Sequence, residues 1–315
     1  RRRRQRGAQR TERADRVGLR PAFGLVGHRK AGEKLRELLE LEQIELNLYL
    51  GQNESRGGLR LFGGQVLAQA SRAAYRTVDA VRLHSLHGYF LRAGNAERPV
   101  LYEVERIRDG KSFSTRRVVA IQSGEAIFNM DVSFQKEELG FEHADPVPNV
   151  PLPAELADDV EVALAAEDNE RISPFARRAR PFETRSVCRL GSEAALAPRL
   201  FNPVWLRFPL PIESTEVALR HCLLAYASDM GMVSTGNLPH QDEVSRDSVQ
   251  MASLDHALWI HRPVPMGEWM LFHKRTSVAH GARAMVHADF FSECGQLIAS
   301  ATQDGLVRPT RADSR

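Results

Sequence analysis

Polar and ionisable side chains interrupt an apolar run between residues 250 and 263, which reads QMASLDHALWIHRP. A hydroxyl at Ser253, a carboxylate at Asp255 and imidazoles at His256 and His261 all fall within this short segment. Burying such groups without partners costs roughly 1–3 kcal/mol each, so a strand that only filled a core would not carry them. The run therefore predicts a strand with a functional role.

The composition is typical of a globular protein of one large domain or two ordinary ones, because 43% of the 315 residues are hydrophobic and 26% are charged. The uncharged apolar runs are far shorter than the ~20 residues of a membrane helix, so we expect no membrane span. Three cysteines without a CxxC pair, and histidines without an HExxH pattern, predict no metal and no cofactor. This cysteine usage also favours a reducing compartment, and we expect a cytoplasmic protein.

Residues 1–30 are predicted to form a disordered, arginine-rich tail, because residues 1–20 hold nine arginines against Glu12 and Asp15. Such a tail could also contact nucleic acid or act as a transit peptide. Aromatic residues make up only 7% of the chain and no stripe of basic and aromatic residues is present, so we expect no nucleic-acid partner.

The elements that must position the polar residues follow one order twice, a helix and then an antiparallel meander. The predicted helices cover residues 63–77 and 214–229, and the second is apolar almost all round, which indicates burial. Predicted strands cover residues 84–91, 99–108, 114–122 and 126–134 in the first copy, and 251–260, 268–278, 282–291 and 297–307 in the second.

Two near-constant offsets relate the halves, which indicates two copies of one α+β unit. Ser85-Leu86-His87 and Ser253-Leu254-Asp255 differ by 168 positions, while Gly124 and Gly295 differ by 171. The predicted domains are therefore residues 31–139 and 181–310, joined by a proline-rich linker over 140–180. Alternation of apolar and polar residues also predicts a half-buried strand from Ile44 to Leu50.

Six blocks of sequence stand out along the chain. They are GLRLFGGQVLAQA at 58–70, HSLHGYFLR at 84–92, RDGKSFSTRR at 108–117, YASD at 226–229, SLDH with Trp259 and HRP at 253–263, and QDG at 303–305. In this order they resemble the acyl-CoA thioesterase II family, which is also called TesB-like and belongs to the C/M/P thioester hydrolases. The resemblance covers about residues 34–308.

The resemblance implies a double hotdog fold and an enzyme of fatty acid metabolism that hydrolyses acyl-CoA to a free fatty acid and coenzyme A. It also implies that Asp229, Ser253 and Gln303 together orient the attacking water. The chemistry suits these residue types, since a carboxylate can take the proton of water while a hydroxyl and an amide fix its position. No Gly-x-Ser-x-Gly elbow is present, which argues against the α/β-hydrolase type of thioesterase.

Three residues of the first copy are candidates for binding the substrate. His84 is a reserve candidate in the strand that corresponds to the Ser253 strand. Arg116 and Arg117 could meet the phosphates of coenzyme A, or could be one inward and one outward strand charge.

Two other functions stay open at this stage. A hotdog hydratase or dehydratase acting on acyl-CoA would use an acid–base pair, for which Asp255 and His256 are the obvious neighbours. Adjacent strand residues point to opposite faces, however, so they make a poor pair. A non-enzymatic protein that binds acyl-CoA or nucleic acid is the third hypothesis. Members of the resembled family commonly assemble, so we expect a homodimer or homotetramer.

Overall fold

Two helix-and-meander units follow one another in the computed structural model, which describes residues 25–54, 60–165, 180–188, 199–241 and 248–310. Most of the predicted tail over residues 1–30 lies outside this described part. Residues 25–30 differ from the prediction, because they belong to a helical segment over 25–38 and His28 within it is buried.

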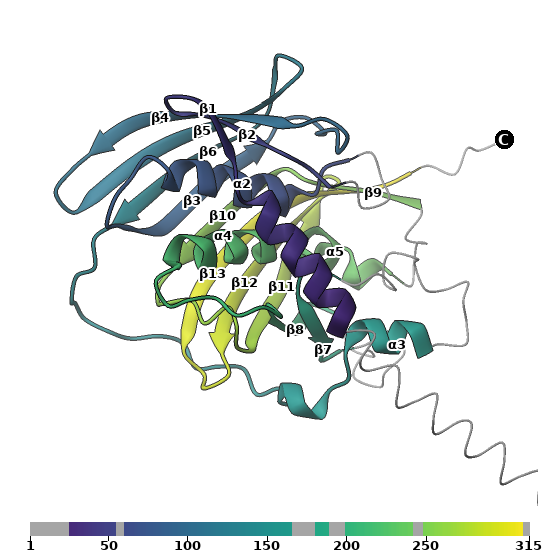
Figure 1. Cartoon of the computed structure of the whole chain (residues 1–315). Helices are drawn as coiled ribbons and strands as arrows, with labels where there is room; N and C mark the ends of the chain where they lie inside the picture. The colour runs from purple at the N-terminus through teal and green to yellow at the C-terminus, as the bar shows by residue number, and fades with distance from the viewer. Residues whose placement is uncertain (1–24, 55–59, 166–179, 189–198, 242–247, 311–315) are drawn as a thin grey trace, which may run out of the picture.

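The first unit wraps one long helix in an antiparallel sheet (Figure 1). Its elements are β1 (Glu42–Glu45), β2 (Leu48–Gly51), α2 (Gly63–Tyr75), β3 (Arg82–Phe90), β4 (Val100–Asp109), β5 (Phe113–Gln122) and β6 (Glu125–Gln135). The predicted single strand over residues 44–50 is instead the short hairpin β1–β2, because Asn47 turns the chain with a φ of 60°.

The second unit repeats this plan and adds a short helix after the long one. Its elements are β7 (Glu183–Ser186), β8 (Phe201–Arg207), α4 (Val217–Ser228), α5 (Met232–Gly236), β9 (Val249–Ser253), β10 (Asp255–Ile260), β11 (Met270–His280), β12 (Arg283–Ser292) and β13 (Leu297–Pro309). Two single turns of 3-10 helix (Pro153–Glu155 and Leu238–His240) and α3 (Asp159–Ala165) complete the elements. The two long helices and the first meander appear where the sequence predicted them. In the second meander, the single strand predicted over 251–260 breaks at Leu254 into β9 and β10, which leaves Ser253 at the end of β9.

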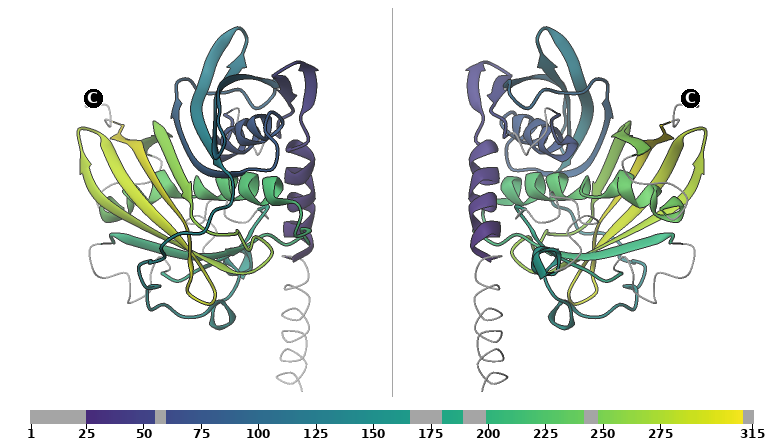
Figure 2. Two further views of the ribbon diagram at one scale, coloured as in Figure 1. Left: turned by 90° about the vertical axis from the view of Figure 1, so that its left-hand side faces the viewer. Right: turned by 90° about the vertical axis from the view of Figure 1, so that its right-hand side faces the viewer.

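The sheets of the two units join into one through their counterpart strands, β3 and β10, which pair antiparallel from Ser85–Trp259 to Tyr89–Asp255. The order of neighbouring strands is β1-β2-β4-β5-β6-β3-β10-β13-β12-β11-β8-β7, and β9 pairs with β13. Both long helices lie on the same side of this sheet, as the two side views show (Figure 2). One apolar core therefore runs through both units.

The helices α2 and α4 pack against each other and run antiparallel. Small residues of α2, including Ala70, Ala73 and Ala74, are fully buried in this layer. A Cβ added to Gly64 would lie only 2.5 Å from the Tyr226 carbonyl oxygen, so the first turn of α2 touches the last turn of α4. This contact brings the N-terminus of one helix to the C-terminus of the other.

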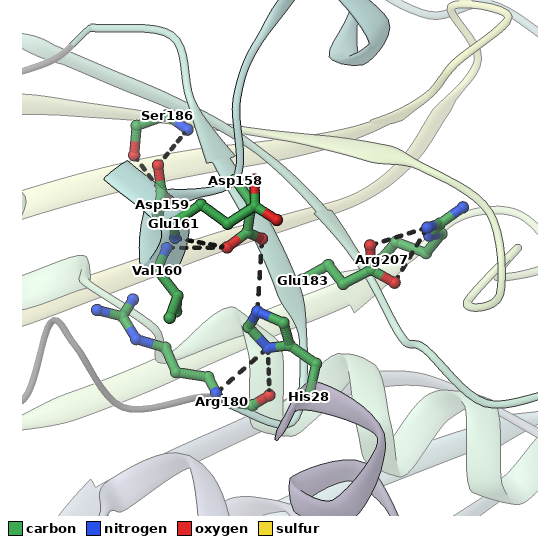
Figure 3. A network of polar contacts seen from close by, with 9 residues as sticks. All are labelled: His28, Asp158, Asp159, Val160, Glu161, Arg180, Glu183, Ser186 and Arg207. Atoms are coloured by element: carbon green, nitrogen blue, oxygen red, sulfur yellow. Dashed lines mark hydrogen bonds and ion pairs between the residues drawn. The ribbon is translucent and has the colours of Figure 1, made fainter. Parts of the chain in front are cut away.

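The described residues 140–165 of the linker contain α3 and contact the second unit. The Trp205 indole donates a hydrogen bond to the Pro151 carbonyl at 2.8 Å on the sheet face opposite α4. At the edge of the sheet, Figure 3 shows His28 of the helical segment 25–38 between Asp158 and the Arg180 backbone. These contacts tie the start of the described chain to the linker.

Candidate active site

Asp229 lies at the point where the two helix ends meet. It is the C-cap of α4, directly after Ser228, and only 7% of it is exposed. A helix C-terminus disfavours a carboxylate, but the N-terminus of α2 stands beside it and supplies a backbone N–H from Gly64. The antiparallel contact of the helices therefore makes a buried carboxylate possible here.

Two strands bring the other predicted residues to this carboxylate. Gln303, in the middle of β13, donates from Nε2 to Asp229 Oδ1 at 2.7 Å, and Ser253, at the end of β9, donates to the same oxygen at 3.3 Å. Ser253 stands opposite Gly305 in the pairing of β9 with β13, so it reaches the carboxylate from beside Gln303. The structure thus brings together the three residues that the sequence analysis named.

Burial dominates the electrostatics of Asp229. It raises the pKa of the carboxyl from 3.8 to about 6, while the hydrogen bonds from Gln303, Gly64 and Ser253 oppose the rise. All three of these partners are uncharged. Asp229 is therefore ionised at neutral pH but is a stronger base than an exposed aspartate.

The Gln303 amide has one unused polar atom. Its Nε2 donates to Asp229, but its Oε1 is buried and receives no hydrogen bond from the described residues. Burying an acceptor without a donor destabilises the fold by roughly 1–3 kcal/mol. Gln303 Oε1, on the amide that bonds to the Asp229 carboxylate, is therefore a place where a donor such as water would bind.

Two glycines at the start of α2 belong to the site, and the sequence analysis did not assign them a role there. A Cβ on Gly63 would lie 2.8 Å from Asp229 Oδ2 and 2.9 Å from the Phe90 ring. Gly64 combines its N–H bond to the carboxylate with its close approach to Tyr226. The available signal was the Gly-Gly pair itself. Glycine destabilises a helix, so two glycines at its start indicate that another group lies close to the backbone there.

The neighbours Asp255 and His256 do not form an acid–base pair. Asp255 Oδ1 accepts a hydrogen bond from the Asp304 backbone at 2.7 Å, whereas His256 Nε2 lies 2.8 Å from Ser228 Oγ in the helix layer. The two side chains leave opposite faces of β10, as the alternation of a strand requires. This geometry removes the pair that the hydratase hypothesis needed.

His84 contacts residues of the first sheet and none of the three site residues. Its Nε2 lies 2.8 Å from Ser133 Oγ, and its ring packs edge-on against Phe113. Burial, followed by the charge of His87, lowers the pKa of His84, so the ring is neutral at pH 7.

Of the two arginines of β5, one side chain points inward and the other outward, which was the alternative to a role in binding phosphates. Arg116 is 1% exposed and donates to Thr77 and to Asp109, so the fold already uses the guanidinium that was a candidate for phosphates. Arg117 is half exposed on the other face and donates to Asp131 at 2.9 Å. Neither arginine contacts the residues around Asp229.

No cluster of three or more potential metal ligands occurs among the residues that the structure describes. Within the same ranges, none of the helices is long and apolar enough to cross a membrane.

Comparisons with known proteins match both units. Residues 52–135 match the family described as acyl-CoA thioesterase N-terminal domain, and residues 198–306 match the family described as acyl-CoA thioesterase. Acyl-CoA thioesterase 2 of Haemophilus influenzae is 35% identical over 289 residues, which cover 86% of this chain and 96% of that protein. Mouse acyl-coenzyme A thioesterase 8 is 36% identical over 284 residues, covering 86% and 88%.

Solved structures agree with these sequence relatives. The crystal structure of an acyl-CoA thioesterase II from Mycobacterium marinum is 38% identical, with a TM-score of 0.71, and the match covers 87% of this chain and 98% of that one. A hot dog fold protein from Alicyclobacillus acidocaldarius, 18% identical, matches with a TM-score of 0.70 over 87% of this chain and 98% of that one. The prediction of a double hotdog is confirmed.

Proposed function

Since the chain belongs to the acyl-CoA thioesterase II family and hydrolyses acyl-CoA thioesters, we propose that Asp229, Ser253 and Gln303 activate the water that attacks the thioester. The observation that carries this assignment is the convergence of the Gln303 amide and the Ser253 hydroxyl on one oxygen of a buried carboxylate. No other described carboxylate combines this burial with donors from two strands and a helix N-terminus.

The reaction needs a base for a weak nucleophile. As the water oxygen bonds to the thioester carbon, its proton moves to Asp229, and the tetrahedral intermediate then expels the coenzyme A sulfur. The proton leaves Asp229 for the thiolate, so the products are the fatty acid and free coenzyme A. A pKa of about 6 suits this exchange, because the base is ionised near neutrality and binds a proton readily.

Gln303 orients the water in this mechanism. Its Nε2 donates to Asp229 Oδ1, whereas its Oε1 is a buried acceptor that receives no hydrogen bond from the described residues. A water that donates one proton to Gln303 Oε1 and the other to Asp229 points a lone pair away from both. Such fixed orientation lowers the entropic part of the barrier.

The N-terminus of α2 assists at the carbonyl oxygen. The partial positive charge of a helix N-terminus stabilises negative charge, and the lack of a side chain at Gly63 lets the Asp229 carboxylate lie close to this helix start. Charge that develops on the carbonyl oxygen during attack is stabilised at this position.

Thiol release from acyl-CoA by Asp229→Asn tests the assignment, with Asp255→Asn as the matched control. Removing a general base costs typically 10²–10⁴-fold, so we expect at least a hundredfold loss in kcat/KM for the first variant and less than threefold for the second. Asp229→Asn with turnover within threefold of the parent would disprove the role of Asp229. Hydration of an enoyl-CoA that depends on Asp255 would instead favour the hydratase.

For the assembly, we propose a homodimer or homotetramer. Large apolar side chains on β3 and the linker are exposed to solvent, with exposed fractions of 62% for Tyr89 and 108% for Phe141. A second copy could cover these side chains. Sedimentation velocity tests this, and a single species with the mass of one chain at micromolar concentration would contradict it.

For the location, we propose the cytoplasm. Cys188, Cys222 and Cys294 are all free thiols, and two of them are exposed, which fits a reducing compartment. Cell fractionation with antibodies against the untagged protein tests the proposal, and recovery from an oxidising compartment or an organelle would contradict it.

A further inference from the structure

His256 is a buried polar residue that the proposed mechanism does not use. It lies on β10 opposite Gly88 of β3, where the sheets of the two units join, and only 1% of it is exposed. Its Nε2 is 2.8 Å from the hydroxyl of Ser228, which is the last residue of α4 and the residue immediately before Asp229. His256 thus contacts the helix end that carries the proposed base.

The hydrogen bonds of Ser228 define the state of the imidazole. Ser228 Oγ donates its single proton to the Ala225 carbonyl at 2.9 Å, so it can only accept from His256. Nε2 therefore carries a proton. Burial lowers the pKa of His256 to about 3, so the ring is neutral and Nδ1 is a bare acceptor, which receives no hydrogen bond from the described residues.

A neutral imidazole of this kind neither supplies charge to Asp229 nor exchanges protons near neutral pH. What it does provide is a fixed bond between the sheet and the last turn of α4. Helix ends fray readily, and Gly231, three residues after Ser228, turns the chain in the left-handed region with a φ of 73°. The position of the Asp229 backbone depends on how firmly this turn is held.

We propose that His256 is a positioning residue, which acts through Ser228 to hold the end of α4 and so keeps the Asp229 carboxylate against Gln303 and away from bulk water. This inference rests on the proposed role of Asp229 as the base. Because Gln303, Ser253 and Gly64 are uncharged, any change in the titration of Asp229 must come from altered hydration or altered hydrogen bonds.

Loss of the bond has a consequence that can be measured. If the end of α4 loosens, water reaches Asp229 and the pKa falls from about 6 toward 3.8, the value of a hydrated aspartate. The acid limb of kcat/KM, which reports the free enzyme, then moves to lower pH. A weaker and less well placed base also lowers kcat. KM should stay nearly the same, because the contacts that bind the substrate are not disturbed.

Three variants test the positioning role. His256→Leu removes the donor and Ser228→Ala removes the acceptor, and we expect each to lower kcat roughly tenfold, with KM within twofold, and to move the acid limb down by about one pH unit. His256→Gln places an amide N–H near the position of Nε2. It should restore most of kcat and return the acid limb to about pH 6.

His221 supplies the matched control, because it is a second buried, neutral histidine and lies on α4 itself. Its Nδ1 lies 2.7 Å from the Tyr75 hydroxyl, and burial lowers its pKa to about 4. It precedes Ser228 by seven residues, or about 10 Å along the helix. His221→Leu should lower the unfolding temperature as much as His256→Leu does, but should leave the acid limb in place.

Several outcomes overturn the proposal. One is an unchanged acid limb in both His256→Leu and Ser228→Ala, whether or not kcat falls. Another is an equal shift in His221→Leu, and a third is no recovery in His256→Gln. If His256→Leu does not fold, Ser228→Ala and His256→Gln decide the matter. Full activity of Asp229→Asn would be a separate result, which removes the base itself.

Discussion

The close approach of Gly63 to Asp229 predicts that one added methyl group will displace the carboxylate. Gly63→Ala adds one methyl group to the first residue of α2, where its Cβ would lie 2.8 Å from Asp229 Oδ2 and 2.9 Å from Phe90. Ordinary van der Waals contacts begin near 3.4 Å, so the carboxylate must move by about 0.6 Å or the helix must shift as far. Misplacement by 1 Å can cost about 10²-fold, so we expect kcat to fall roughly ten- to a hundredfold.

The assay is thiol release from one saturated acyl-CoA at several concentrations, followed with a thiol-reactive dye, beside thermal unfolding by circular dichroism. Gly267→Ala is the control, because a Cβ there meets no atom within 4 Å. Replacement of glycine by alanine near a helix start is not expected to destabilise the backbone itself. Gly63→Ala with more than half of the parent kcat would refute the idea that the start of α2 fixes the carboxylate.

Three further predictions follow from the titration of buried groups. Because burial raises the pKa of Asp229 to about 6 and its ionised form is the proposed base, kcat/KM should fall tenfold per pH unit below that value. A pH profile that is flat down to pH 5 would contradict this. Burial lowers the pKa of Lys274 from 10.5 to about 7, so burying its charged form destabilises the fold fully below pH 7 and not at all above pH 10.5. Lys274→Met should therefore raise the free energy of unfolding by about a few kcal/mol at pH 7 but leave it nearly unchanged near pH 11, as measured by denaturant unfolding. Burial alone would lower the pKa of His28, but Asp158 and the Arg180 carbonyl raise it overall, and the pKa of Asp158 is lowered. The ion pair therefore stabilises the protein between about pH 4 and 6.5, where both groups are charged. Asp158→Asn should lower the free energy of unfolding in this range and much less at pH 9, and equal losses of free energy at both would count against the ion pair.

Local periodicity was sufficient to predict the elements that carry the site. The apolar surface of α4 on every side and the alanines of α2 indicated two buried helices, and the helices lie within a few residues of the predicted ranges. The repeat matched Ser85–His87 of β3 with Ser253–Asp255, which span the end of β9 and the start of β10, and β10 is the strand that joins the second sheet to β3. Alternation failed at residues 44–50, because Asn47 can adopt a positive φ that the pattern does not reveal.

Contacts between distant segments could not be predicted in this way. The convergence of Asp229, Ser253 and Gln303 followed from the family resemblance, since nothing in their spacing requires a helix end and two strands to meet. The bond between His256 and Ser228 and the burial of Lys274 depend on which face of each strand turns inward. His28 fell in a segment whose arginines indicated disorder, although its imidazole is buried between α3 and the Arg180 backbone.

Among the described residues, the two ends of the contact between α2 and α4 hold different polar groups. Antiparallel packing of α2 and α4 brings together a helix start and a helix end twice, once at Gly63 and Asp229 and once near Tyr75 and His221. At the second junction the phenol and the imidazole bond to each other at 2.7 Å. After burial, the charges of Arg82 and Arg220 lower the pKa of His221, and the same positive charges would also lower the pKa of a carboxylate at this place. The same helix contact therefore holds the proposed base in one place and a bonded phenol–imidazole pair in the other.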